Sequence, residues 1–411
     1  MKTLLLISIA LLLSATNLTA NGSDWPAWRG AERTGQVSGP EWPTNLDNLK
    51  AKWTVPLGKS YSSPIIANDR VFVFETTDEK TVTVRALNRA DGSELWKKSW
   101  ASSFTVPGFA LANGSWVKST PAWNGKTLFV GDMREVLVAF DGVTGEEKWR
   151  IDFPETYGTQ VPPFGFSSSP LAVDDKLYVQ AVNSVFKLEA ATGEVVWRAM
   201  SGHNPDDMSQ QGAFSSPVLT TLADKEQLLI MTRASLNGID PQNGDQLWSE
   251  AIPHFRGCLI VTPTVYGEGI FTSSFRNGSY FYNLSADEGK VNAEQVWSNK
   301  ISGYMSSPIV IGGYAYMHLT NNRMACIDLK TGETTWTTTG KFSKYASMIW
   351  QDDRILVLAA DGMLHLLEAN PKEFTSIASQ KVAEGETWAY LGISGSELYV
   401  RELEGLTVYT W

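Results

Sequence analysis

A phrase that ends in tryptophan recurs along the chain and constrains its fold more than any other feature. Clear copies end at Trp96, Trp149, Trp197, Trp248 and Trp336, and in each copy a glycine stands four residues before the tryptophan. Self-similarity at a period of a few tens of residues is typical of repeat architectures. The sequence therefore predicts a scaffold of repeated units, and any activity is expected in the loops between them.

A second feature fixes the phase of the repeat. About twenty residues after each tryptophan, a small residue followed by proline opens an apolar run. Two further runs lack the proline and open at Met348 and Leu391. The chain thus has eight unit starts, 40 to 57 residues apart. The prolines of the other six are Pro64, Pro121, Pro170, Pro217, Pro263 and Pro308.

Each unit has the pattern of four short strands. Residues 308–319 give a strand, a Gly-Gly turn and a second strand, and residues 324–328 and 334–338 give two more. Four strands in each of eight units predict an all-β, eight-bladed β-propeller. The last unit ends at Trp411 without a fourth strand, whereas an unattached copy of that strand, residues 50–55, precedes the first unit. We expect this N-terminal strand to complete the last blade, because it would remove a free sheet edge.

The periodic tryptophans have two possible roles. They could form a platform on which sugars or bases stack, or they could pack as wedges between neighbouring blades. One indole per unit, always after the same turn, favours packing. Two junctions should be irregular, because Ile377 replaces tryptophan in the seventh unit and an insertion precedes Trp297 in the fifth. The predicted structural docking residues are Trp53, Trp96, Trp149, Trp197, Trp248, Trp297 and Trp336.

The chain divides into a leader and one large domain. Residues 1–20 have the charge and the short apolar run of a cleaved secretory signal. Residues 21–49 are expected to form an N-terminal strap, and residues 50–411 the propeller. Beyond the signal, no apolar stretch is long enough to span a bilayer. We therefore expect an exported protein, periplasmic or secreted, with no transmembrane segment in the mature chain.

Composition excludes one class of partner. Hydrophobic residues make up 43% of the chain and charged residues 19%, which is typical of a globular protein with a large core. The net charge is −10 and no block of Lys or Arg is present, so nucleic acid is not an expected partner. In an exported chain Cys258 and Cys326 could pair. We favour two free thiols, because Cys326 occupies a strand position that alanine occupies in the first two units.

The repeated phrase Ala-x-Asp-x-x-Thr-Gly-x-x-x-Trp resembles the tryptophan-docking motif of the pyrroloquinoline-quinone (PQQ)-like repeat family. The resemblance covers residue 50 to the end of the chain. It implies an eight-bladed propeller in which each tryptophan stacks on the glycine peptide of an adjacent blade. The family includes quinoprotein alcohol dehydrogenases and BamB, a scaffold lipoprotein of outer-membrane protein assembly. The segment 24–30 also resembles the openings of exported PQQ-like repeat proteins.

The two branches of the family imply different functions. The dehydrogenases need two adjacent cysteines over the quinone, a calcium ion held by acidic and amide side chains, and an aspartate base. This chain has no adjacent cysteines. We therefore expect the BamB-like branch: a non-catalytic scaffold that binds a protein and has no cofactor. The alternative is a PQQ-dependent oxidoreductase acting on alcohols or sugars, and only this alternative implies PQQ and calcium.

The loops that lead from one unit to the next are long and aromatic. On a propeller they emerge on one face around the central channel, and long loops on a rigid scaffold commonly carry binding residues. These aromatic side chains could instead only pack the loops onto the ring. His203, with Asp206 and Asp207, could begin a metal site, although a solvated loop is the simpler interpretation. The candidate partner-binding residues are Phe104, Phe109, Trp116, Tyr157, Phe164, His203, His254, Phe255, Arg256 and Tyr304.

Overall fold

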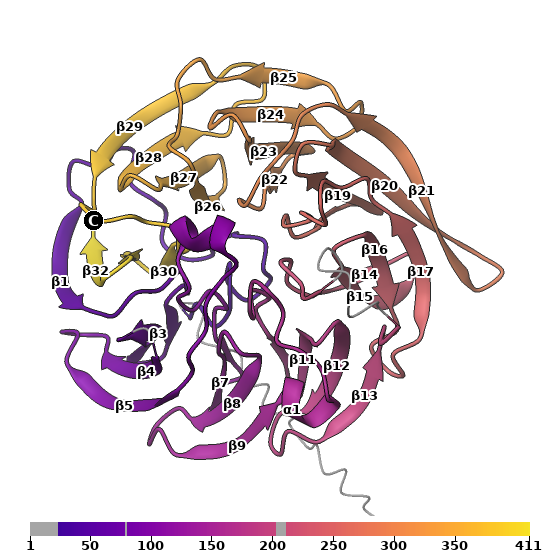
Figure 1. Ribbon diagram of the computed structural model, residues 1–411. Helices are drawn as coiled ribbons and strands as arrows, with labels where there is room; N and C mark the ends of the chain where they lie inside the picture. Colours follow the sequence, from indigo (N-terminus) through magenta and orange to yellow (C-terminus); the bar gives the residue numbers. More distant parts are fainter. Residues whose placement is uncertain (1–23, 79, 203–210) are drawn as a thin grey trace, which may run out of the picture.

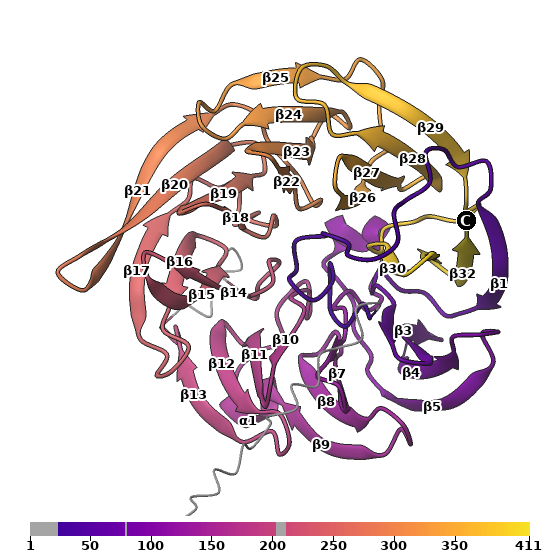
Figure 2. The ribbon, with the colours of Figure 1, turned by 180° about the vertical axis from the view of Figure 1, so that it is seen from behind.

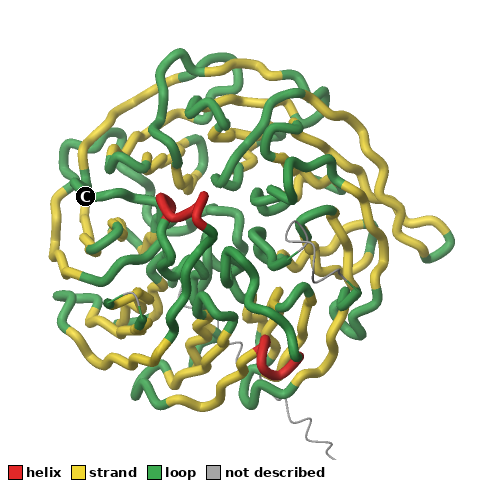
Figure 3. The backbone as a smooth tube through the Cα atoms, in the orientation of Figure 1, coloured by secondary structure: helices red, strands yellow, loops and turns green. Residues whose placement is uncertain are grey.

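The computed structural model describes residues 24–78, 80–202 and 211–411. Across these residues, eight four-stranded antiparallel sheets surround a central axis as the blades of a disc (Figure 1). The helices of the described chain are two short segments, η1 (Gly108–Asn113) and α1 (Phe153–Tyr157), and strands dominate the trace (Figure 3). The prediction of an all-β, eight-bladed β-propeller is confirmed.

Blades 1 to 7 each consist of four strands that follow one another in sequence from the axis outward. Blade 1 contains β2 (Ile65–Ala67), β3 (Arg70–Thr77), β4 (Thr81–Asn88) and β5 (Glu94–Ala101). Blade 2 contains β6 (Ala122–Trp123), β7 (Thr127–Gly131), β8 (Val136–Asp141) and β9 (Glu147–Asp152). Blade 3 contains β10 (Leu171–Val173), β11 (Lys176–Ala181), β12 (Ser184–Glu189) and β13 (Val195–Ala199). Blade 4 contains β14 (Val218–Leu222), β15 (Lys225–Met231), β16 (Ser235–Ile239) and β17 (Gln246–Ala251).

The second half of the disc repeats this order. Blade 5 contains β18 (Thr264–Tyr266), β19 (Gly269–Ser274), β20 (Gly278–Asp287) and β21 (Lys290–Asn299). Blade 6 contains β22 (Ile309–Ile311), β23 (Tyr314–His318), β24 (Met324–Asp328) and β25 (Thr334–Thr337). Blade 7 contains β26 (Ala346–Gln351), β27 (Arg354–Ala359), β28 (Met363–Glu368) and β29 (Thr375–Lys381). Blade 8 contains β30 (Gly392–Ser394), β31 (Glu397–Glu402), β32 (Gly405–Thr410) and β1 (Lys50–Pro56).

The ring closes in blade 8, where strands from both ends of the chain meet. Strand β1 pairs antiparallel with β32, with Trp53 opposite Val408. The N-terminal strand therefore completes the last blade, as the sequence predicted. This pairing gives β32, the C-terminal strand, a neighbour on each side and so removes a free edge.

The hydrophobic core lies between the blades. Middle strands are buried on both faces because each faces a neighbouring sheet, and Phe72 and Phe74 of β3 are almost fully buried. These side chains pack with Val130 and Phe140 of blade 2 in one cluster. Outer strands such as β5 alternate between exposed and partly covered positions. This arrangement explains why the middle strands are rich in β-branched and aromatic residues.

Most of the repeated tryptophans contact the next blade in the same way. The indole Nε1 atoms of Trp96 and Trp149 donate hydrogen bonds to the carbonyl oxygens of Gly142 and Ala190, at 3.1 and 3.0 Å. In each clear copy of the phrase, the glycine four residues before the tryptophan has positive φ. The indole of the preceding blade covers this glycine. A Cβ atom at Gly193 would lie 2.8 Å from the Trp149 ring. Equivalent contacts involve Trp53, Trp197 and Trp297, whereas Trp336 donates to the Asn370 carbonyl without a glycine.

Trp248 departs from this pattern, because it packs against the next blade without stacking on a glycine of that blade. Its Nε1 donates to Gln227 Oε1 within its own sheet at 2.6 Å. The insertion before Trp297 lengthens β20 and β21 to ten residues each, and their hairpin extends beyond the rim of the disc (Figure 1). Leu284 and Val291 of this hairpin share a hydrophobic cluster with Trp248. Because the hairpin replaces the tight glycine turn, this indole packs against hairpin side chains instead of a glycine peptide.

The strap, residues 24–49, crosses the face of the disc shown in Figure 2. Its backbone bridges to Ile66 at Trp25 and to Trp350 at Gln36. Two buried arginines of the strap reach toward the axis. Arg33 donates to the carbonyl oxygens of Ser169, Pro170 and Pro217, and Arg29 donates to that of Pro308. The strap therefore links blades 3, 4 and 6 through main-chain groups. The predicted secretory signal, residues 1–20, lies outside the described residues.

Candidate functional site

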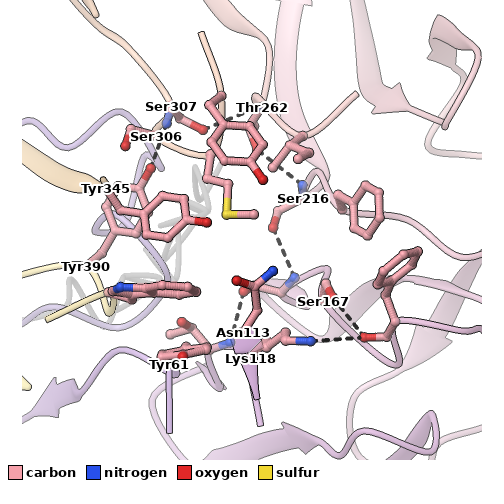
Figure 4. A pocket seen from close by; sticks show the side chains of 18 of the residues that line it. Tyr61, Asn113, Lys118, Ser167, Ser216, Thr262, Ser306, Ser307, Tyr345 and Tyr390 are labelled. Carbon is pink, nitrogen blue, oxygen red and sulfur yellow. Dashed lines mark hydrogen bonds between the residues drawn. The ribbon is translucent and has the colours of Figure 1, made fainter. Parts of the chain in front are cut away.

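A ring of hydroxyl groups surrounds the axis. The residue before each of the six prolines is serine or threonine, and five of these donate their main-chain N–H to the hydroxyl of the equivalent residue in the next blade. The series from Ser63 to Thr120, Ser169, Ser216, Thr262 and Ser307 has distances of 3.0 to 3.2 Å. The Ser307 N–H then donates to the Tyr390 hydroxyl at 2.7 Å (Figure 4), and the Tyr390 N–H donates to Ser63 Oγ at 2.9 Å. The small residue before proline thus supplies a hydroxyl that joins neighbouring blades, a role that was not predicted from the sequence.

A cavity of about 420 Å³ borders this ring. Trp28 of the strap also lines the cavity, and η1 lies over the centre of the opposite face, in front of the axis in Figure 1. The third residue before every one of the eight unit starts is also part of the lining. These residues are Tyr61, Lys118, Ser167, Phe214, Ile260, Met305, Tyr345 and Trp388. The repeat therefore places one side chain of each blade in the cavity wall. These residues could have been identified from the sequence by counting back three positions from each unit start.

Lys118 is the one charged residue in the described lining of the cavity. Its Nζ atom lies 3.4 Å from the carbonyl oxygen of Phe164 (Figure 4). Part of the side chain borders the hollow, but burial among apolar groups lowers the pKa of the ammonium to about 8. The cavity thus combines aromatic walls, hydroxyl groups and a single desolvated amine.

Three of the predicted binding residues line the cavity: Phe109, Phe164 and Tyr304. Phe109 lies on η1, is 76% exposed, and has its ring centre 6.0 Å from that of Phe164. Tyr304 packs between Phe275 and Tyr345, with ring centres 4.6 and 5.6 Å away. Burial raises the pKa of the Tyr304 hydroxyl, so this group stays protonated.

Three others form the rim in the loop between β17 and β18. Phe255 is 39% exposed, and the guanidinium groups of Arg256 and Arg276 lie 5.4 and 5.1 Å from its ring centre. His254 accepts the Gly257 N–H at its Nδ1 atom, at 2.9 Å, and so shapes the loop. Phe255 also contacts Phe275, which lines the cavity. The rim and the cavity are therefore continuous.

The remaining candidates lie away from the cavity lining. Phe104 packs against the cluster between blades 1 and 2. Trp116 contacts Tyr61, and Tyr157, at the end of α1, contacts Phe186. These three side chains pack loops onto the ring, which is the alternative role that the sequence left open. His203 lies outside the described residues, as do Asp206 and Asp207.

The described residues do not fit PQQ and calcium. The quinone carries three carboxylates, and calcium prefers six to eight oxygen ligands that include carboxylates. The described lining has one cation and no Asp or Glu. The described part of the chain also holds no cluster of three His, Cys, Asp or Glu placed for a metal. Cys258 and Cys326 are both free and lie in different parts of the ring, so they form no adjacent pair.

Comparison with known proteins places the chain. A family model described as outer membrane protein assembly factor BamB matches residues 80–338, which is more than half of the chain. The chain belongs to this BamB family. The BamB of Yersinia pestis is 22% identical over 352 residues, covering 79% of this chain and 82% of that protein. The BamB of Burkholderia pseudomallei is 25% identical over 251 residues, covering 50% and 64%.

Solved structures agree with the fold. The crystal structure of BamB from Moraxella catarrhalis has a TM-score of 0.63 and 16% identity, and the match covers 88% of this chain and all of that one. The quinohemoprotein alcohol dehydrogenase from Comamonas testosteroni has a TM-score of 0.66 and 12% identity, covering 94% and 80%. At these identities the likeness shows a shared fold. Within the described residues, no helix is long and apolar enough to cross a membrane.

Proposed function

We propose that this member of the BamB family is an exported, non-catalytic scaffold that binds a protein partner during the assembly of outer-membrane proteins. Membership of the family supports the role in assembly. The apolar run and Lys2 at the start of the chain support export. The partner surface is the face of the disc that carries η1 and the rim around Phe255.

The observation that carries this proposal is the exposure of large apolar side chains on that face. Phe109 and Leu111 of η1 are 76% and 55% exposed, although they lie at the centre of a well-packed disc. Phe255 is exposed on the rim, with the guanidinium groups of two arginines near its ring. Aromatic residues and arginine are enriched at the centres of protein interfaces, where their burial contributes most of the binding energy.

Site-specific photocrosslinking tests this proposal. A photoreactive phenylalanine analogue is placed at Phe109 or Phe255 in the full-length protein, in its native host, and crosslinked proteins are identified by mass spectrometry. We expect a component of outer-membrane protein assembly at both positions. The matched control position is Val143, which is 63% exposed in the outer turn between β8 and β9.

A binding variant completes the test. The double change Phe109→Ala and Phe255→Ala should abolish capture of the crosslinked partner but leave the unfolding temperature unchanged, because both side chains are exposed. The control variant Val143→Ala should capture the partner as the unchanged protein does. Undiminished capture by the double variant, or equal crosslinking at Val143, would refute the proposed surface.

A further inference from the structure

Some hydroxyls of the ring have no hydrogen-bond acceptor among the residues that the structure describes. Each ring hydroxyl accepts an N–H from the preceding blade, as Ser169 Oγ accepts from Thr120 and Ser216 Oγ accepts from Ser169. A hydroxyl that accepts one hydrogen bond still has its own proton to donate. For Ser63, Ser169 and Ser216, no acceptor of that proton is found among the described residues. Because all three line the cavity, the ring offers donors to oxygen atoms of a guest.

The walls of the cavity are aromatic. Tyr61 stacks on Trp388 with ring centres 4.4 Å apart, and Trp388 meets the edge of Tyr345 at 4.0 Å. Phe164 and Phe214 contact each other at 5.4 Å elsewhere in the lining. Rings held in this way present fixed apolar faces and edges, which suit a planar apolar molecule. A volume of about 420 Å³ lies within the range of small-molecule sites, roughly 300–1,000 Å³.

Lys118 gives the cavity its charge preference. The ammonium has three N–H donors. Among the described residues its one acceptor is the carbonyl oxygen of Phe164, at 3.4 Å. Among the described residues Lys118 has no carboxylate partner, which makes a desolvated cation costly, and an anion in the cavity would offset that cost. The lowered pKa of about 8 expresses the same cost, since burial favours the neutral amine.

We propose that the central cavity binds a small planar aromatic molecule that carries one oxyanion, such as a carboxylate. The anionic group contacts Lys118, the ring system lies between the aromatic walls, and further oxygen atoms accept hydrogen bonds from the hydroxyl ring. The single cation of the lining can neutralise one negative charge. A site for a quinone with three carboxylates and a calcium ion would need several more charged groups. This proposal does not rest on the scaffold function, although Phe109 belongs to both surfaces, and disproof of that function would leave it standing.

Binding of 2-naphthoate to the purified mature protein tests the proposal, with calorimetry and tryptophan fluorescence as readouts. The uncharged 2-naphthamide is the matched probe. We expect 2-naphthoate to bind with one molecule per chain, and Lys118→Met to weaken its binding about tenfold or more, because a charge-assisted hydrogen bond is lost. The same variant should change 2-naphthamide binding less than about twofold. Lys330→Met, in the exposed turn between β24 and β25, is the control variant.

A second variant and a pH series locate the probe. Met305→Trp fills the cavity and should abolish binding of both probes. As the pH rises through about 8, Lys118 loses its proton, so 2-naphthoate affinity should fall while 2-naphthamide affinity stays constant. In the Lys118→Met variant the fall should disappear.

Three results would overturn the proposal. The first is no measurable binding of 2-naphthoate to the unchanged protein. The second is equal 2-naphthoate binding by the Lys118→Met or Met305→Trp variant, which would place the probe elsewhere. The third is stoichiometric binding of PQQ with calcium that displaces 2-naphthoate, because the cavity would then accept the tricarboxylate that its single cation does not match.

Discussion

At the scale of single residues, the propeller depends on pairs of one indole and one glycine. Trp149 covers Gly193 of the next blade and donates its N–H to the Ala190 carbonyl. The glycine has φ of 75°, which disfavours a side chain, and a Cβ atom would also strike the indole. Conformation and contact thus both require glycine here, and each pair fixes the position of one blade on the next.

Gly193→Ala separates these two requirements. We expect a loss of about 2–4 kcal/mol in the free energy of unfolding, from backbone strain together with the clash against Trp149. Gly395→Ala is the matched control, since Gly395 has φ of 61° and no atom within 4 Å of the added Cβ position. The control should lose only about 1 kcal/mol. Urea unfolding of both variants measures the difference, and equal losses would show that the indole contact adds nothing.

Glu135 is a buried acid that makes stability depend on pH. Its carboxyl accepts the Val182 N–H of blade 3 at 2.9 Å. Burial, and secondarily the nearby Asp132, raises the pKa of this carboxyl to about 8. Between its ordinary pKa and about 8, the folded protein keeps a proton that the unfolded chain has released. Stability from this group is therefore full at acid pH and declines as the pH rises toward 8.

The variant Glu135→Gln removes this dependence and can keep the hydrogen bond to Val182. Its unfolding temperature should equal that of the unchanged protein near pH 4 and exceed it increasingly up to pH 8. Differential scanning fluorimetry across this range measures the effect. Glu146→Gln, at an exposed turn, is the control and should show no such divergence. A constant offset for Glu135→Gln at every pH would contradict the assignment.

At the scale of elements, the strap is a structural part of the ring. Arg33 is buried, and burial lowers the pKa of its guanidinium to about 9. This cation has three main-chain carbonyl partners, one in Ser169, one in Pro170 and one in Pro217. These carbonyls belong to the inner ends of blades 3 and 4. The strap thus satisfies acceptors near the axis that the strands themselves do not use.

Arg33→Ala should therefore destabilise the propeller by about 3 kcal/mol, because buried acceptors lose their donors. The variant also removes the desolvation cost of the buried guanidinium, which offsets part of that loss. The control is Arg134→Ala, which removes an exposed arginine of the turn between β7 and β8. Urea unfolding at pH 7 compares the two variants. If both unfold at the same urea concentration, the strap contributes no stability through Arg33.

At the scale of the whole molecule, ionic contacts join the two ends of the chain. Glu397 of β31 binds Lys52 of β1 at 2.7 Å and Arg89 of blade 1 at 2.6 Å. Burial by itself favours the neutral acid, but hydrogen bonds from Lys52, Arg89 and Tyr399 outweigh it and lower the pKa of Glu397. Contacts from β1, from β31 and from the turn after β4 therefore converge on the carboxylate at the closure of the ring.

Glu397→Gln should lower the unfolding temperature at neutral pH. Because the pKa of this acid is lower in the folded protein, its contribution is present above the ordinary carboxyl pKa and is lost as the pH falls through the folded value. The gap between variant and unchanged protein should close in acid. Thermal unfolding from pH 7 to pH 3 measures it. Glu373→Gln, at an exposed position between β28 and β29, is the control. A gap that persists unchanged at pH 3 would contradict this account.

The propeller and most of its tryptophan contacts could be predicted from the sequence, because the same local interactions recur in each unit. The same turn and the same indole occur in unit after unit, so one interpretation applies to many positions. Sequence reasoning did not foresee the partner of Trp248, which packs on the side chains of a longer hairpin in the next blade and not on a glycine turn. Of the residues that line the cavity, Phe109, Phe164 and Tyr304 are among the binding candidates predicted from loop composition. Lys118 was missed, because the absence of Asp and Glu from the described lining around it is a property of the closed ring.

The sequence by itself determined the number of blades, the closure of the last blade by an N-terminal strand and the face that carries the long loops. These follow from short-range patterns, namely alternation, turn residues and the spacing of the repeat. Only the tertiary structure decided that the hydroxyl groups before the prolines join in a ring and that eight positions, one per blade, enclose a cavity. Those features arise between residues that are 45 to 327 positions apart, where side-chain direction and distance depend on the curvature of the whole disc.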